Sequence, residues 1–320
     1  MDHWIKPHTF SFEDEIEKFK ALLVHIDKVE TKYYKQYFIP DTVIDNSIFV
    51  PTLKDFMSKA NMPKNLEKWL QIHSNSSTIY ANSSEADLRI EYIAFTRKLI
   101  FDLTHSFLLL KSQISEQGRT RFAEVFGEIY NLDEYFFTNA IENGVENLIN
   151  NYLFRSFTIW EYTLRGLVKF ATVHQRQEIK QVHKDGHVMD GKPLLEYYKD
   201  GPILWRSFAR YLGLDSPEYN NLVELSSEIR ATSHNFNIYL PPGKNPQDKQ
   251  IEYKGNVYNL EVDKVINFLS LDFLRLLLKD NFDLMIKVFE SKNVKQYRQI
   301  PGRFKREWFL GFDLNFKYLR

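Results

Sequence analysis

The stretch IRATSHN, residues 229–235, holds an arginine and a histidine four residues apart, Arg230 and His234. An arginine keeps its proton near neutral pH, and its planar fork fits the oxygens of a phosphate. A histidine has a reference pKa of about 6.5, so it can give or take a proton at pH 7. Together they have the chemistry to cleave RNA without a metal ion. The histidine would act on the ribose 2′-hydroxyl or the leaving 5′-oxygen, and the arginine would stabilise charge on the phosphoryl oxygens.

The same pair has a purely structural interpretation. Apolar spacing predicts a helix over residues 216–234 with a buried stripe of Leu222, Leu225 and Ile229. The arginine and the histidine lie off that stripe, near the C-terminal end of the helix, where the helix dipole favours positive charge. In this interpretation they contact only the last carbonyl groups, and the chain is a non-catalytic helical protein that binds a partner or senses a ligand.

The segment resembles the HEPN superfamily of small helical bundles, many of which are ribonucleases of toxin and phage-defence systems. The family signature is an arginine, a polar residue and a histidine near the end of a late bundle helix, followed by a loop and a final helix. IRATSHN, the loop over 235–261 and the helix expected from about 262 follow that order. Two features depart from the family pattern. Three residues separate Arg230 from His234 where the family usually leaves four to six, and Ala231 stands where Asn, Asp or His is common.

The resemblance covers about 145–290 and implies a metal-independent endoribonuclease without a cofactor, acting as a toxin or phage-defence effector. Its products would be a 2′,3′-cyclic phosphate and a 5′-hydroxyl. It also implies a homodimer with a composite site, and an antitoxin or regulatory protein as a further partner. An acidic residue of an upstream helix faces the site in this family, and Glu161 in FTIWEYTLRGL is its counterpart here. The alternative for Glu161 is a salt bridge to Arg165, one helical turn away.

The C-terminal tail, residues 291–320, is rich in basic and aromatic side chains. Arg303, Lys305, Arg306 and Trp308 are the candidate RNA-binding residues, because cations beside stacking rings suit single-stranded RNA. The alternative is a tail that packs its aromatic rings on the bundle and leaves its lysines in water.

Two further histidines, His183 and His187 in VHKDGHVMD, have the spacing of a shared metal site on a helix, with aspartates nearby. Gly186 and Gly191 predict a turn instead of a helix. We therefore expect a solvated polar connection and no metal site.

Three other polar residues have structural interpretations. His105 stands inside the apolar run FDLTHSFLLL and is expected to be a hydrogen-bonded core histidine. Glu224 and Glu228 share a face of the helix over 216–234 that points away from Arg230. A solvated face is the expectation for these two carboxylates.

The amino-acid composition indicates the general class of the protein. Of 320 residues, 43% are hydrophobic and 15% aromatic, with only 12 glycines and 11 prolines, which predicts an ordered chain with long elements and few tight turns. Lys plus Arg equals Asp plus Glu at 42 each, so any basic surface has to be local. The absence of cysteine excludes disulfides, thiolate catalysis and Cys-ligated zinc.

Targeting signals are not evident. The N-terminal stretch MDHWIKPHTF has no basic region followed by an apolar core, so it does not predict a secretory signal. The most apolar long run, IAFTRKLIFDLTHSFLLL, is interrupted by charges and does not predict a membrane span. We expect a soluble cytoplasmic protein with no membrane partner.

Strands do not alternate with helices, and no Gly-rich phosphate-binding motif is present, so the expected fold is an all-α helical bundle. Residues 251–260 predict a small β-hairpin turning at Gly255 and Asn256. The expected division is a helical N-terminal region of unassigned role over 1–144, a HEPN-like bundle over 145–290, and the tail. Gly144 is expected to stop a helix, and Ser83 or Ser84 to cap one. Further helices are expected over 11–38, 145–173, 194–212 and 262–290.

Overall fold

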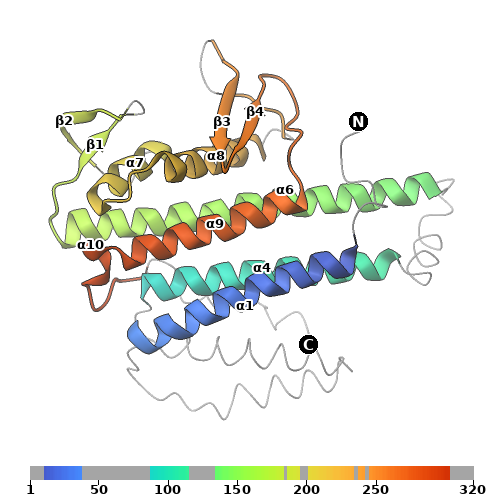
Figure 1. Ribbon diagram of the computed structural model, residues 1–320, viewed down its shortest axis with the longest axis horizontal. Coiled ribbons are helices and arrows are strands. Elements are labelled where there is room, and N and C mark those ends of the chain that lie inside the picture. The colour runs from blue at the N-terminus through green and yellow to red at the C-terminus, as the bar shows by residue number, and fades with distance from the viewer. Residues whose placement is uncertain are drawn as a thin grey trace, which may run out of the picture. The chain divides into compact units, whose positions relative to one another are not determined.

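The computed structural model describes residues 11–37, 87–114, 134–183, 186–194, 201–233, 237–241 and 245–302. Within these ranges the chain is mostly helical and has two short antiparallel hairpins (Figure 1). The prediction of an all-α bundle with a small β-hairpin insertion is confirmed.

The elements follow one another along the chain in this order. The helices are α1 (Phe12–Tyr37), α4 (Leu88–Ile114), α6 (Glu134–Lys169), α7 (Gly201–Leu212), α8 (Pro217–Ser233), α9 (Leu271–Glu290) and α10 (Lys292–Lys295), and a π-helical turn, η1 (Phe170–His174), extends α6. The strands are β1 (Lys180–Val182), β2 (Val188–Pro193), β3 (Lys249–Tyr253) and β4 (Asn256–Leu260).

The chain forms two compact units. The first comprises residues 1–29 and 96–297, and the second residues 30–95 and 298–320. The functional division into 1–144, 145–290 and 291–320 stays a prediction. The candidate site lies entirely in the first unit.

The predicted helix stop at Gly144 is wrong, because α6 runs through this residue without a break. A side chain here would be crowded, since an ideal Cβ at Gly144 would lie 3.1 Å from Cδ2 of Leu110 on α4. The glycine therefore permits a close approach of α4 to α6 rather than ending the helix.

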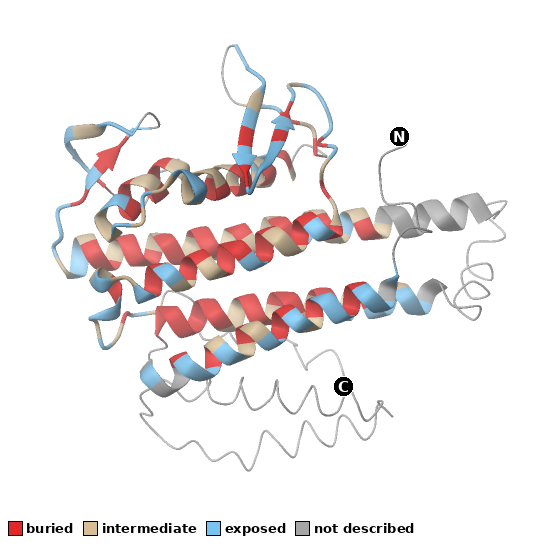
Figure 2. Cartoon of the chain, in the orientation of Figure 1, coloured by how far each residue is buried: buried red, intermediate tan, exposed pale blue. Residues whose placement is uncertain are grey.

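The core of the first unit is built on one face of α6, whose predicted apolar stripe is confirmed. Its members are all buried: Leu153, Phe157, Trp160, Leu164, Leu167, Val168 and Ala171. Figure 2 shows this face in red along α6 and the facing side of α9. Full burial of each large apolar side chain contributes roughly 1.5–3 kcal/mol, so this stripe is a main source of stability.

Helices α8 and α9 both begin directly after a serine. The Ser216 hydroxyl accepts from the Tyr219 amide at 3.3 Å, and Pro217 occupies the first helical position, where no amide is needed. The Ser270 hydroxyl accepts from the Phe273 amide at 3.2 Å. These caps fix the starts of the two helices that flank the predicted loop.

The predicted start of the last helix at about residue 262 is wrong. Residues near 265 instead pair with the chain after α8, through a bridge between Ile238 and Val265 and a 3.0 Å hydrogen bond from the Tyr239 amide to the Lys264 carbonyl. Asp263 has a φ of 60°, a left-handed value that a helix does not allow.

The β3–β4 hairpin turns at Lys254 and Gly255, one residue before the predicted position. Both have positive φ, 50° and 75°, as a two-residue type I′ turn requires. The hairpin is fastened to α9, because the Tyr253 hydroxyl donates to Asp280 at 2.9 Å and the Lys254 ammonium pairs with the same carboxylate at 2.7 Å.

In the second unit, α4 begins at a buried ion pair. The Asp87 carboxylate accepts from the Arg89 backbone amide at 2.9 Å and from its guanidinium at 2.7 Å. The Ile300 amide donates to the same carboxylate at 3.0 Å, and the Leu88 amide donates to the Ile300 carbonyl at 2.9 Å. Asp87 thus caps α4, while the predicted caps, Ser83 and Ser84, lie outside the described residues.

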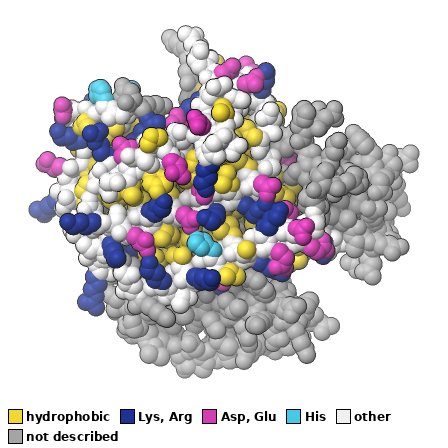
Figure 3. Space-filling view, viewed as in Figure 1, with side chains coloured by type: hydrophobic (Ala, Val, Ile, Leu, Met, Phe, Trp, Pro, Cys, Tyr) yellow, Lys and Arg dark blue, Asp and Glu magenta, His cyan; other side chains and the backbone are white. Residues whose placement is uncertain are grey.

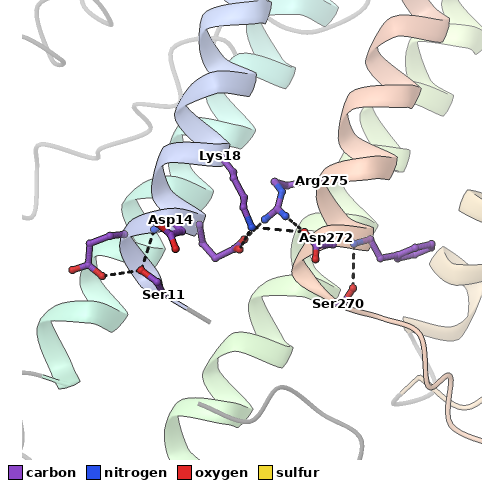
Figure 4. A network of polar contacts seen from close by, with 9 residues as sticks. Ser11, Asp14, Lys18, Ser270, Asp272 and Arg275 are labelled. Carbon is purple, nitrogen blue, oxygen red and sulfur yellow. Dashed lines mark hydrogen bonds and ion pairs between the residues drawn. The ribbon is translucent and has the colours of Figure 1, made fainter. Parts of the chain in front are cut away.

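Helix α1 packs by the apolar stripe expected from its sequence, which is buried throughout: Ile16, Phe19, Leu23 and Ile26. A polar network joins it to α9 (Figure 4). Arg275 of α9 pairs with Glu15 of α1 and with Asp272, and Lys18 lies 2.8 Å from Glu15. Glu15 is buried, so these cations compensate a charge that has little access to water.

His105 is exposed on α4, which contradicts its expected place in the core. Neighbours on this surface, Leu108 and Leu109, are exposed as well, so the apolar run is wider than the face that α4 buries. Among the described residues, none of the helices combines the length and the apolar composition needed to cross a bilayer.

Candidate active site

Glu161 is the centre of the candidate site. It lies on α6, one residue after the fully buried Trp160, and only 8% of its surface is exposed. A carboxylate this deep requires hydrogen bonds or opposite charges, because burial disfavours its ionised form.

Two arginines supply that compensation, one on each carboxylate oxygen. Arg165, one turn along α6, donates from Nε to Oε1 at 3.1 Å. Arg230, on α8, pairs with Oε2 through its Nη1. Glu161 therefore forms the salt bridge to its helical neighbour Arg165 and also pairs with Arg230.

Arg230 lies at the edge of the packed face of α8, not away from it as the sequence suggested. The buried arc of the helix extends beyond the predicted stripe to Val223 and Ser226. The Arg230 guanidinium carbon is 5.8 Å from the centre of the Phe154 ring, within the range of a cation–π contact. The side chain remains 34% exposed, so one side of it faces solvent.

The start of α7 closes in on the same carboxylate. An ideal Cβ at Gly201 would lie 3.9 Å from Oε1 of Glu161 and 4.0 Å from Oγ of Ser227 on α8. Three helices, α6, α7 and α8, therefore converge on the Glu161 carboxylate.

The site carries excess positive charge. One carboxylate faces two guanidinium groups, which stay protonated at any physiological pH. Among the described residues, Arg230 has one hydrogen-bond acceptor, Glu161. The Nη1 group of Arg230 donates to it. The Nη2 and Nε donors of Arg230 are therefore available for an anion within this part of the chain.

The structure brings together two of the three predicted catalytic residues, Glu161 and Arg230. The third, His234, follows Ser233, the last residue of α8, and lies outside the described residues. The four predicted RNA-binding residues also lie outside them: Arg303, Lys305, Arg306 and Trp308.

His183 and His187 flank the turn of the β1–β2 hairpin, as the glycine pattern predicted. Gly186 has a φ of 90°, and its amide donates to the His183 carbonyl at 2.9 Å. The two rings are exposed, with centres 6.2 Å apart. In the described ranges no three His, Asp or Glu side chains are grouped as a metal site would require.

The prediction that Glu224 and Glu228 form a solvated face is wrong. The Lys249 ammonium on β3 lies 2.7 Å from Glu224 and 2.5 Å from Glu228, and Arg206 on α7 pairs with Glu224 at 3.0 Å. Burial would lower the pKa of Lys249, but the hydrogen bonds to the two carboxylates outweigh it and raise that pKa. The glutamates therefore fasten the hairpin to α8.

Sequence reasoning missed two contributors to the site, Phe154 and Gly201. Phe154 precedes Glu161 by seven residues, two helical turns, and this spacing places both on one face of α6. Nothing in the sequence near Gly201 signals its approach to α6, because that contact depends on how α7 packs.

No protein family, curated protein or solved structure matches this chain.

Proposed function

We propose that the protein is a metal-independent endoribonuclease of the HEPN type, acting as a cytoplasmic homodimer in toxin or phage-defence systems. The observation that carries the proposal is the contact between Glu161 of α6 and Arg230 of α8. These residues are 69 positions apart, and the resemblance to the HEPN superfamily implies an acidic residue of an upstream helix that faces the site.

In this mechanism Arg230 binds the scissile phosphate. Glu161 holds the guanidinium through Nη1, which leaves Nη2 and Nε to donate to phosphoryl oxygens. Glu161 is thus a positioning residue. Because Arg165 also pairs with the Glu161 carboxylate, the negative charge of Glu161 does not fully neutralise Arg230. As negative charge builds on phosphorus, the excess positive charge stabilises it.

His234 is proposed to transfer the protons. As a base it takes the proton of the ribose 2′-hydroxyl, and the oxygen then bonds to phosphorus while the bond to the 5′-oxygen breaks. The leaving oxygen takes a proton from a second histidine acting as an acid. A homodimer provides that histidine, and the products are a 2′,3′-cyclic phosphate and a 5′-hydroxyl.

The test is cleavage of labelled tRNA and mRNA in EDTA. Arg230→Ala and His234→Ala are expected to lower the rate by about 100-fold or more, the usual effect of removing one charge-stabilising or proton-transferring group. Arg155→Ala is the matched control, because Arg155 is an exposed arginine of the same helix as Glu161. Cleavage that survives both site substitutions, or a strictly monomeric active enzyme, would contradict the mechanism.

One observation favours the non-catalytic alternative, a helical protein that binds a partner or senses a ligand. Glu161 is buried with each carboxylate oxygen on an arginine, as in an ion pair that only joins two helices. Under this alternative, wild-type protein leaves all RNA intact, and Arg230→Ala lowers the free energy of unfolding without changing any activity.

A further inference from the structure

A group of five cations gathers at one end of the first unit, at the C-terminal ends of α7 and α9. We call this group the basic end, and its members are Arg176, Lys192, Arg210, Lys292 and Lys295. All five are exposed. Figure 3 shows lysine and arginine side chains along this edge of the molecule, near β1, β2 and α10.

Specific contacts bring these sequence-distant residues to one place. Arg210, near the end of α7, donates to the Gly186 carbonyl in the β1–β2 turn at 3.2 Å. Asn293 of α10 donates to the Tyr211 carbonyl at 2.7 Å. The Phe170 and Tyr297 rings, 4.9 Å apart, join η1 to the chain after α10.

The charge of this end departs from the neutral balance of the chain. The described residues of 170–194, 201–212 and 291–297 contain seven lysines and arginines against two carboxylates, an excess of five. Lys180 pairs with Asp190, and Arg206 pairs with Glu224. In this described part of the chain, no carboxylate pairs with any of the five cations of the basic end.

Arg176 has a backbone conformation that its side chain does not explain. Its φ is 52°, in the left-handed region, which glycine adopts freely and arginine only at a cost. The side chain is exposed, so packing does not require an arginine there. A glycine at position 176 would therefore suit this backbone conformation better than the arginine does.

We infer that the basic end binds the phosphate backbone of single-stranded RNA and directs it along α7 to the candidate site. This inference rests on the proposed nuclease function. Gly201 at the start of α7 lies beside Glu161, and Arg210 lies nine residues further along. At 1.5 Å per residue, Gly201 and Arg210 are about 14 Å apart along α7, so one RNA strand can contact both Arg210 and the candidate site.

An anionic membrane fits this surface less well than RNA. Binding to a bilayer surface requires apolar side chains that enter it, in addition to cations. Of the exposed large hydrophobic residues in the described part of the chain, only Val173 belongs to this end. Cations without an apolar face suit a phosphate backbone in water.

The test compares two triple variants of the full chain that lose the same charge. The first, Arg176→Gly with Lys192→Gln and Lys295→Gln, removes cations of the basic end, and the glycine suits the backbone at 176. The control, Lys20→Gln with Lys111→Gln and Lys264→Gln, removes lysines elsewhere in the same unit, each of which pairs with a glutamate. The probe is a labelled 2′-O-methyl RNA, which lacks the attacking hydroxyl, and its binding is followed by fluorescence anisotropy between 50 and 200 mM salt.

The basic-end variant is expected to bind the probe more weakly, with a salt slope of log K smaller by about 2, because each phosphate contact of a single strand contributes about 0.7. The control is expected to match wild type. Equal binding by all three proteins, no binding by wild type, or binding only to phosphatidylserine vesicles would overturn the inference. Cleavage of unmodified RNA is measured separately. If wild type leaves RNA intact but the basic-end variant alone loses binding, the nuclease proposal is refuted and the basic end is not. If wild type cleaves RNA and all three proteins bind the probe equally, the basic end is refuted and the nuclease proposal is not.

Discussion

Trp160 and Trp205 are neighbouring, fully buried indoles with ring centres 5.6 Å apart, and they differ in one hydrogen bond. The Trp205 N–H donates to Asn220 at 2.9 Å. The Trp160 N–H has no acceptor among the described residues. A buried donor without an acceptor lowers stability, so the indole N–H of Trp160, next to Glu161, is expected to be destabilising.

Substitution of each tryptophan by phenylalanine tests this difference. Both changes remove the same atoms, but Trp205→Phe also removes a hydrogen bond, whereas Trp160→Phe removes an unpaired donor. We expect Trp205→Phe to lower the free energy of unfolding by about 1 kcal/mol more than Trp160→Phe, as measured by urea denaturation. A larger loss for Trp160→Phe would show that its N–H is paired.

At the scale of residues, the sequence was informative where a pair lies close along one helix. The contact between Glu161 and Arg165 follows from helical spacing alone, whereas no spacing links Glu161 to Arg230, which lies 69 positions away. The lysine that binds Glu224 and Glu228 was not predictable, because Lys249 meets them only after the β3–β4 hairpin folds onto α8. Periodicity predicts which face a residue occupies but not what packs against that face.

At the scale of elements, the starts of α8 and α9 each depend on a single side chain. Ser216 caps α8 and Ser270 caps α9 in the same way. Ser216 was predictable, because a serine followed by proline signals a helix start. Ser270 was not, because residues 262–266 also follow an apolar rhythm and only their pairing with residues 237–239 excludes a helix.

Ser216→Ala and Ser270→Ala are each expected to lower the free energy of unfolding by about 1 kcal/mol, since each leaves a helical amide without its acceptor. Ser216→Asp and Ser270→Asp are expected to retain stability, because aspartate caps equally well. Ser156→Ala is the control, since that serine lies inside α6 and its hydroxyl donates to the Leu153 carbonyl. Urea denaturation of the five variants measures the effect, and caps that behave like the control would contradict it.

At the scale of the whole molecule, tyrosines set the response to alkaline pH. Burial is the first cause that raises the pKa of five of them above the ordinary value of 10.0: Tyr152, Tyr211, Tyr239, Tyr253 and Tyr258. The negative charge of Asp280 adds to the effect of burial on Tyr253. The folded chain therefore holds these protons more tightly than the unfolded chain.

A pKa that is higher in the folded state gives stability that is complete below the unfolded value and is lost as pH rises. We therefore expect the free energy of unfolding to fall steadily above about pH 10. Tyr253→Phe removes one of the contributing hydroxyls and is expected to give a shallower fall. Urea denaturation at several values between pH 8 and 11 measures both slopes, and equal slopes would contradict the assignment to Tyr253.

The polar contacts between α1 and α9 have a consequence for the synthesis of the chain on the ribosome. Glu15 and His25 are made early, whereas their partners Arg275 and Asp283 follow 260 and 258 residues later. At about 5–20 residues per second, that interval is roughly 13–52 s. Throughout it, α1 lacks its contacts with α9. We therefore expect the side of α1 that carries Glu15 and His25 to stay accessible to chaperones at the ribosome exit until α9 has been made.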